Sequence, residues 1–139
     1  MKKLFILSVI VLSSAAAMAQ SKVWKNDPAH SRLGFVVKHL TISEISGRFA
    51  DFSVDVTTTK ADYSDAQISV TAKVASIDTD IEARDNHLRS ADFFDAEKYP
   101  VLTFKSIYLK KTGQNEGKLY GNLNFHGITK AVKLDVTYF

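Results

Sequence analysis

Four side chains able to take part in acid–base chemistry lie in two short segments of the sequence. Asp27 stands three residues before His30, and Arg84 stands three residues before His87. A carboxylate beside an imidazole can move a proton, and a guanidinium can stabilise a developing negative charge. A hydrolase or lyase that uses Asp27, His30, Arg84 and His87 is therefore one hypothesis for this protein.

The spacing of these residues argues against that hypothesis. Asp85 and His87 are two residues apart, so on one helix they point in different directions. His30 follows an Asp-Pro turn, where side-chain hydrogen bonds usually tie down the start of a strand. Ser31 lacks the Gly-x-Ser-x-Gly surroundings of a nucleophilic serine. We therefore expect no catalytic residues and a protein that is not an enzyme.

The histidines do not have the spacing of metal ligands. The sequence has four of them, and none stands in an i, i+4 pair or a His-x-His pair: His30, His39, His87 and His126. Cysteine is absent, so neither a thiolate ligand nor a disulfide is available. We expect no metal site and no cofactor.

The N-terminus has the pattern of a secretory signal peptide. Lys2 and Lys3 precede an apolar run over residues 4–17, and Ala17-Met18-Ala19 is a small-x-small cleavage site. The run is shorter than the ~20 residues of a membrane-spanning helix, so we expect no stable membrane insertion. We predict a signal peptide over 1–19, cleavage near Ala19, and one domain over 20–139, either periplasmic or secreted.

The charge of the remaining chain is nearly balanced. The sequence has 18 basic and 15 acidic residues, and the signal peptide takes Lys2 and Lys3 with it, which lowers the formal charge from +3 to +1. The lysines and arginines alternate with acidic residues along the chain, as on an ordinary solvated surface. We therefore expect no nucleic-acid partner.

Most of the chain after the signal peptide alternates between apolar and polar residues, which is the pattern of half-buried strands. Apolar residues recur at every second position in five segments: 33–37, 52–56, 68–74, 119–125 and 132–138. Gly127 is expected in a tight hairpin turn and residues 112–117 in a looser one. These features predict an all-β fold, an antiparallel β-barrel with short helices at its ends.

Two segments interrupt the strand pattern. Residues 41–47 have apolar residues three apart and end on Gly47, which predicts a helical turn. Thr79, followed three residues later by Glu82, fits the capping box of a longer helix. Ile81 and Leu88 are expected on the buried face of that helix.

The last seven residues still alternate when the chain stops at Phe139. A closed barrel leaves no free strand edge. We expect either that the barrel is incomplete at its C-terminus, because the sequence is truncated, or that the last strand pairs with another chain, for example in a homodimer.

An ordered set of motifs over residues 24 to about 136 resembles the YceI-like family. Its members are Trp24, Asp27-Pro28-Ala29-His30-Ser31, Phe35, Lys38-His39-Leu40, Gly47-Arg48-Phe49, Ser76-Ile77-Asp78-Thr79, Arg84-Asp85-Asn86-His87-Leu88, Phe93-Phe94-Asp95, Tyr99-Pro100, Phe104-Lys105-Ser106, Gly121-x-Leu123 and Gly127-x-Thr129-Lys130. The resemblance implies a lipocalin-like β-barrel in the periplasm of Gram-negative bacteria, whose apolar interior holds a long polyisoprenoid chain. It implies no established catalytic activity. Family members usually continue beyond the point where this sequence ends.

Alternation alone cannot tell a filled barrel from a hollow one. The resemblance to the family favours a hollow barrel, with a ligand that is an isoprenoid lipid, either quinone-like or polyprenyl, held for transport or storage. The apolar residues expected to line the lumen are Leu33, Phe35, Val37, Phe52, Val54, Val70, Val74, Phe94, Leu102, Phe104, Leu123, Phe125 and Leu134.

The polar helix near residues 82–89 has two interpretations. Arg84 and His87 could contact the polar head group of the lipid. Alternatively, Arg84 and Asp85 form structural ion pairs that hold the helix against the barrel, which we favour because such networks are often structural. A third functional hypothesis is an envelope interaction module that docks through the unpaired last strand.

Overall fold

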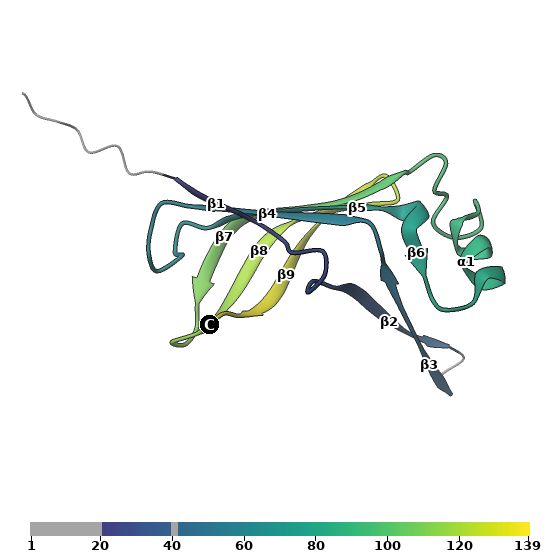
Figure 1. Cartoon of the computed structure of the whole chain (residues 1–139), viewed down its shortest axis with the longest axis horizontal. Coiled ribbons are helices and arrows are strands. Elements are labelled where there is room, and N and C mark those ends of the chain that lie inside the picture. The colour runs from purple at the N-terminus through teal and green to yellow at the C-terminus, as the bar shows by residue number, and fades with distance from the viewer. Residues whose placement is uncertain (1–20, 40–41) are drawn as a thin grey trace, which may run out of the picture.

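The computed structural model describes residues 21–39 and 42–139, which form two antiparallel β-sheets and one short α-helix (Figure 1). The predicted all-β antiparallel class is confirmed. The predicted signal peptide, with its cleavage site near Ala19, lies outside the described residues.

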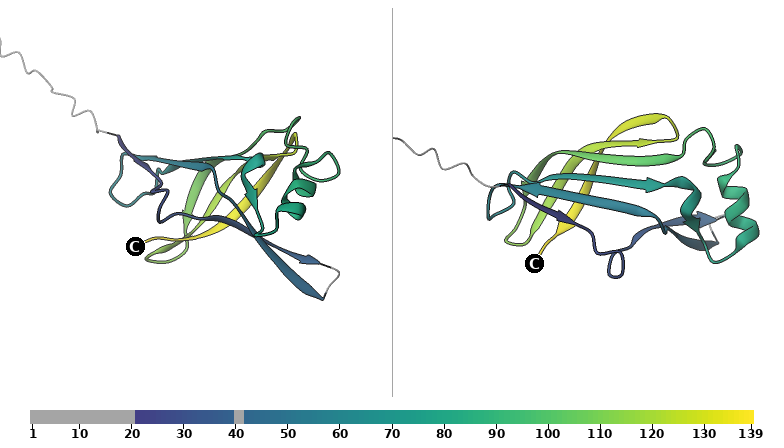
Figure 2. Two further views of the ribbon diagram at one scale, coloured as in Figure 1. Left: turned by 45° about the vertical axis from the view of Figure 1, so that its right-hand side comes forward. Right: turned by 45° about the horizontal axis from the view of Figure 1, so that its top comes forward.

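The larger sheet has six strands. Its order is β1-β4-β5-β7-β8-β9, and every neighbouring pair is antiparallel. The strands are β1 (Lys22–Lys25), β4 (Phe52–Thr58), β5 (Gln67–Lys73), β7 (Val101–Lys111), β8 (Glu116–Phe125) and β9 (Ile128–Thr137). The sheet is strongly twisted, so that β7, β8 and β9 run across the direction of β4 and β5 (Figures 1 and 2).

The smaller sheet has the order β2-β3-β6. Its strands are β2 (Leu33–His39), β3 (Ser43–Phe49) and β6 (Ile77–Asp78), and a 3-10 turn η1 (Val74–Ser76) leads into β6. The predicted helical turn over residues 41–47 is wrong, because Ser43–Phe49 is a strand paired with β2 along its length. The apolar residues Ile45, Gly47 and Phe49 are two apart, and this period matches the strand.

The helix α1 (Glu82–Arg89) lies at one end of the molecule, at the opposite end from β1 (Figure 1). The predicted capping box is wrong: Ile81 occupies the N-cap, and no side chain there bonds to the first turn. Thr79 instead donates its hydroxyl to Asp85 Oδ1 at 2.6 Å. Ile81 is half exposed rather than buried, whereas Leu88 packs against the core as expected.

The strand register separates an apolar face from a polar face on the larger sheet. One row across the sheet joins Val54, Val70, Phe104 and Leu123, and a second joins Phe52, Ala72 and Leu102. Because residues paired across strands share a face, these rows lie together on the concave, apolar side. The alternation read from the sequence is therefore correct in these strands.

Two hairpins connect β7, β8 and β9. Phe125 pairs with Ile128, so His126 and Gly127 form a two-residue turn with φ of 52° and 72°. Positive φ at both positions defines the type I′ turn, which Gly tolerates without strain. The predicted tight turn at Gly127 is confirmed, and the looser turn spans residues 112–115 between β7 and β8.

The buried core lies where the two sheets and α1 meet. Phe49, Ala72 and Ile77 are buried there, and half-buried apolar residues pack around them: Leu33, Phe35, Phe52, Leu88, Phe94 and Leu102. Phe94 packs against Phe49 and Phe125, with ring centroids 6.4 and 5.2 Å apart. In the described residues the two sheets do not join into a closed ladder, as the expected incomplete barrel requires.

Candidate functional site

An apolar cavity of about 300 Å³ lies between the smaller sheet and the concave face of the larger one. Two strands of the smaller sheet form one wall, and four strands of the larger sheet form the other. The lining residues are Leu33, Gly34, Phe35, Phe49, Val70, Leu102, Phe104, Leu123, Val132 and Leu134. The wall is hydrocarbon apart from backbone, so this space suits an apolar guest rather than a polar reactant.

Two glycines shape the walls of this apolar cavity. A Cβ atom on Gly121 would lie 2.4 Å from Phe104 Cζ, and one on Gly47 would lie 2.4 Å from Phe35 Cζ. The two phenyl rings therefore lie directly over glycine backbone. Any larger residue at either glycine would push the ring away from the sheet.

A second apolar cavity, of about 440 Å³, lies on the concave face near the start of β1 and the end of β9. Its aromatic residues form a chain: Trp24 and Tyr63 have ring centroids 5.8 Å apart, and Tyr63 and Tyr138 have centroids 6.1 Å apart. Val56, Ile68, Leu109 and Val136 complete the wall together with Ala66, Thr137 and Phe139. The apolar surface thus extends along much of the concave face.

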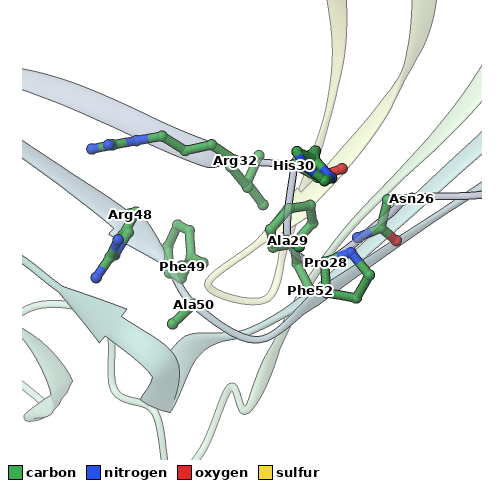
Figure 3. Close-up of a pocket in the computed structure, with 11 residues that line it drawn as sticks. Asn26, Pro28, Ala29, His30, Arg32, Arg48, Phe49, Ala50 and Phe52 are labelled. Carbon is green, nitrogen blue, oxygen red and sulfur yellow. The ribbon is translucent and has the colours of Figure 1, made fainter.

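A more polar pocket of about 400 Å³ adjoins the apolar cavity at the connection between β1 and β2 (Figure 3). Leu33 and Phe49 line both spaces. Arg32 and Arg48 extend to the same side of this pocket, away from Asn26 (Figure 3). The apolar cavity therefore opens toward a region with hydrogen-bonding groups.

One of the two arginines at the polar pocket, Arg48, is already paired. Arg48 donates from Nε and Nη2 to Asp78 Oδ2 at 2.9 and 2.7 Å. This pairing raises the pKa of Arg48. The backbone N–H of Asp80 and the Arg48 guanidinium lower the pKa of Asp78. The pairing favours a structural role for Arg48, linking β3 to β6.

Asp27 and His30 meet as the sequence spacing suggested. His30 Nδ1 lies 2.7 Å from Asp27 Oδ2, and the Ala29 N–H donates to Asp27 Oδ1 at 2.9 Å. The His30 ring and this N–H lower the pKa of the Asp27 carboxyl. Both side chains are largely exposed. The arrangement is that of a hydrogen-bonded turn leading into β2.

Arg84 and Asp85 hold the loop before α1 through Thr79. Asp85 is 6% exposed and accepts the Thr79 N–H at 2.9 Å and its hydroxyl at 2.6 Å. Arg84 donates from Nε to Thr79 Oγ1 and from Nη2 to the Thr79 carbonyl, each at 2.7 Å. The favoured structural interpretation fits these bonds, although their partner is Thr79 rather than an ion pair between Arg84 and Asp85. Arg89 donates from Nε to the Ala75 carbonyl and from Nη2 to the Ile77 carbonyl, each at 2.8 Å.

His87 lies on the exposed side of α1. Its ring packs edge-on against Phe93 at 4.8 Å, and Nε2 lies 3.6 Å from Asp92 Oδ2. The pair Asp27 and His30 lies in the connection between β1 and β2, whereas α1 is at the end of the molecule (Figure 1). The structure therefore does not bring the four residues of the hydrolase hypothesis to one site.

The predicted lumen residues fall into three groups. Seven line the apolar cavity between the sheets: Leu33, Phe35, Val70, Leu102, Phe104, Leu123 and Leu134. Phe52 lines the polar pocket, Val54 pairs with Val70 on the concave face, and Phe94 packs against Phe125 at the α1 end. The other two lie elsewhere: Val37 is half exposed on β2, and Val74 is 1% exposed in η1 rather than in a strand.

Four lining residues were not among those predicted to line the lumen: Phe49, and the aromatic residues of the second cavity, Trp24, Tyr63 and Tyr138. Phe49 could have been found from its period-two spacing with Ile45 and Gly47. Tyr63 carries a φ of 58°, in a turn that no strand pattern marks.

Two other kinds of feature are absent from residues 21–39 and 42–139, which the structure describes. They contain no group of three or more His, Cys, Asp or Glu side chains able to hold a metal ion. No helix in this part of the chain has the length and apolar composition needed to cross a membrane.

Comparison with known proteins places the chain in a family. The YceI-like domain matches residues 24–139. The chain is 33% identical over 132 residues to a UPF0312 protein of Vibrio parahaemolyticus, covering 95% of this chain and 70% of that protein. Across three such UPF0312 relatives, it spans 66% to 71% of their length.

Solved structures have the same fold. BcnA of Burkholderia cenocepacia superposes with a TM-score of 0.74 at 29% identity, over 80% of this chain and 69% of BcnA. A polyisoprenoid binding domain from Saccharophagus degradans, implicated in plant cell wall breakdown, superposes with a TM-score of 0.61 at 20% identity, over 84% of this chain and 68% of that domain. The match of the domain over nearly all described residues shows that this chain belongs to the YceI-like family.

Proposed function

We propose that the protein binds a polyisoprenoid, or a similar long-chain isoprenoid lipid, along the concave face of its larger sheet. The observation that carries this proposal is the apolar cavity between the two sheets, whose ten lining residues are nine apolar side chains and one glycine. The Saccharophagus degradans domain with this fold is described as polyisoprenoid binding, which supports the same ligand class here.

The energetics of such a site depend on the length of the ligand. Each methylene-sized group transferred from water to an apolar wall contributes about 0.8 kcal/mol. A long prenyl chain can therefore bind firmly with few polar contacts, provided that it extends from the first cavity into the second. Along β9, whose ten residues rise about 3.4 Å each, the concave face runs for roughly 34 Å.

We assign the contacts with the lipid tail to the residues predicted from the sequence that line the cavity, and we add Phe49 and Val132. Arg84 and His87 are the proposed head-group contacts. The two hydrogen bonds from Arg84 to Thr79 favour a structural role for Arg84. The exposed His87 is therefore the stronger candidate for a contact with the head group.

The protein acts in this proposal as a carrier or store without catalysis. Residues 20–139 form one lipid-binding domain, exported to the periplasm or outside the cell after removal of residues 1–19. Export suits an isoprenoid-binding role because these lipids belong to the cell envelope. The hydrolase hypothesis has no support from the site geometry, since its four residues lie in two separate places.

Extraction of the purified protein tests the proposal. Organic extracts analysed by mass spectrometry should contain an isoprenoid lipid in a reproducible ratio to protein. Leu134→Asp places a charge in the cavity wall at a residue that is 43% exposed, so the fold should tolerate it. We expect this variant to lose most of the bound lipid.

Ala131→Asp is the matched control. It lies on the same strand but pairs with Asn122, on the polar face of the sheet, and is exposed. This variant should retain its lipid. Extracts without isoprenoid from a folded wild-type protein, or equal lipid content in the two variants, would refute the proposal.

A further inference from the structure

The outer face of β7, β8 and β9 carries a pair of stacked tyrosines surrounded by lysines. Tyr108 pairs with Tyr120 across the strands, and their rings stack with centroids 4.5 Å apart and planes 14° apart. Lys133 pairs with Tyr120 from the other side. These residues alternate with the concave residues Leu109, Leu119 and Leu134, so they lie on the opposite side of the sheet.

Further lysines lie in the neighbouring rows of this face. Lys110 pairs with Lys118, and Lys105 pairs with Asn122. Lys118 is neutralised by Asp135, whereas Lys105, Lys110 and Lys133 are exposed and have no ion pair among the salt bridges of the described residues. A bulge between Ser106 and Tyr108 adds Ile107, which is 55% exposed. We call Lys105, Ile107, Tyr108, Lys110, Tyr120 and Lys133 the outer lysine–tyrosine face.

The acidic and basic residues are not evenly mixed along the chain. Residues 101–139 contain six lysines and two acidic residues, whereas residues 74–100 contain seven acidic and three basic residues. The acidic segment includes α1, at the end of the molecule away from β1 (Figure 1). The near-neutral total therefore conceals a basic sheet face and an acidic helical end.

We propose that the outer lysine–tyrosine face docks the protein on a bilayer surface that contains anionic phospholipid. Basic side chains near such a surface are attracted by its negative potential. Tyrosine favours the level of the head groups, where the ring is apolar and the hydroxyl stays hydrated. Ile107, which precedes Tyr108 in the sequence, adds an exposed apolar side chain to the lysines and tyrosines of this face.

The chemistry of this face fits a lipid surface better than an acidic protein partner. The unpaired charges are lysines, which are mobile point charges, rather than arginines with the fixed fork that recognises one carboxylate pair. They lie on β7 and β9, which flank β8, with neighbouring strands about 5 Å apart. A broad, flexible set of point charges matches an array of mobile phosphate head groups.

The docking proposal goes beyond the proposed function and can be tested without it. Lipid held in the cavities and vesicles bound at the outer face are measured separately. A protein that carries no isoprenoid could still bind vesicles, and a protein that carries isoprenoid could fail to bind them.

Vesicle flotation with the purified protein tests the docking. Vesicles of 70% phosphatidylcholine and 30% phosphatidylglycerol should carry the protein upward at low salt, and binding should fall as salt rises. The triple variant Lys105→Gln/Lys110→Gln/Lys133→Gln should bind on the order of a hundredfold more weakly, at about fivefold for each lysine. Tyr108→Ser should weaken binding with no change in charge.

A triple variant with the same charge change elsewhere is the control. Lys22, Lys38 and Lys60 are exposed and lie outside β7–β9. Their replacement by Gln should leave binding nearly unchanged. Absence of binding, equal binding to pure phosphatidylcholine, or an equal loss in the two triple variants would overturn the proposal. So would self-association at low salt, abolished by the first triple variant, in protein that binds no vesicles.

Discussion

Replacing Gly121 by alanine tests the packing that shapes the apolar cavity. The added Cβ would lie 2.4 Å from Phe104 Cζ and 2.5 Å from the carbonyl oxygen of Lys105. The phenyl ring could turn aside, but the carbonyl belongs to the β7 backbone and cannot. The variant therefore forces either a shift of the strand or a broken contact.

The cost can be estimated from two opposing effects. Overpacking a closed site costs about 1–3 kcal/mol, and a clash with backbone belongs near the upper end of that range. The lost flexibility of the unfolded chain offsets about 0.4–1 kcal/mol of this. We expect the free energy of unfolding to fall by about 2 kcal/mol, which lowers the melting temperature of a domain of this size by roughly 8 °C.

Urea unfolding of wild type, Gly121→Ala and Gly113→Ala measures this effect. Gly113 is the matched control because its Cβ would lie 3.5 Å from Glu116, an ordinary contact, and its φ is not positive. Gly113→Ala should be at least as stable as wild type. Equal midpoints for the two variants would show that Phe104 does not lie against Gly121. The displaced ring should also fill part of the cavity and reduce the lipid recovered.

Two further predictions concern buried and hydrogen-bonded carboxylates. Asp85→Ala leaves the Thr79 N–H and hydroxyl without their acceptor, so the free energy of unfolding should fall by about 1–3 kcal/mol. The control variant His87→Ala should change it little. Equal urea midpoints for these two variants would contradict the role of the bonds between Asp85 and Thr79. Hydrogen bonds from the Thr58 and Thr59 hydroxyls hold the pKa of Asp65 well below its ordinary value. The stability that Asp65 contributes is therefore present above about pH 4. It is lost as the pH falls toward the lowered pKa. Urea midpoints at pH 7 and pH 3 should therefore differ less in Asp65→Asn than in wild type, and an unchanged difference would show that Asp65 does not contribute.

The fold class could be predicted because period-two alternation is a direct consequence of strand geometry. In β8, Leu119, Leu123 and Phe125 read as one face, and the register places them on one face. The turn at Gly127 was equally readable, because few residues other than glycine tolerate its φ.

The errors arose where tertiary contacts decide the local structure. Residues 41–47 have apolar residues three apart, Ile42 and Ile45, which fit a turn of helix, whereas Ser43–Phe49 pairs with β2 and β6 as a strand. Thr79 has the sequence of a helix cap, but the buried carboxylate of Asp85 takes its hydroxyl. Val74 continues the alternation of β5, yet the chain turns into η1 there.

The site could be predicted as a set of residues but not as a shape. Alternation identified which side chains face inward, and seven of them line the apolar cavity. The volume left between those side chains depends on how far the two sheets stand apart, and no local pattern encodes that distance. The uneven distribution of charge along the chain was readable from the sequence, whereas the common face of Lys105, Lys110 and Lys133 depends on the strand register.

The strands of the two sheets are not hydrogen-bonded to one another in the described residues, but the chain passes between the sheets at four places: from β1 to β2, from β3 to β4, from β5 through η1 to β6, and from β6 through α1 to β7. Backbone hydrogen bonds brace two of these crossings, from the Lys73 N–H to the Asp51 carbonyl and from the Ala50 N–H to the Ser76 carbonyl. The distance between the sheets is therefore held by covalent connections and backbone hydrogen bonds as well as by side-chain packing. A guest in the apolar cavity would meet walls whose spacing is fixed before it arrives.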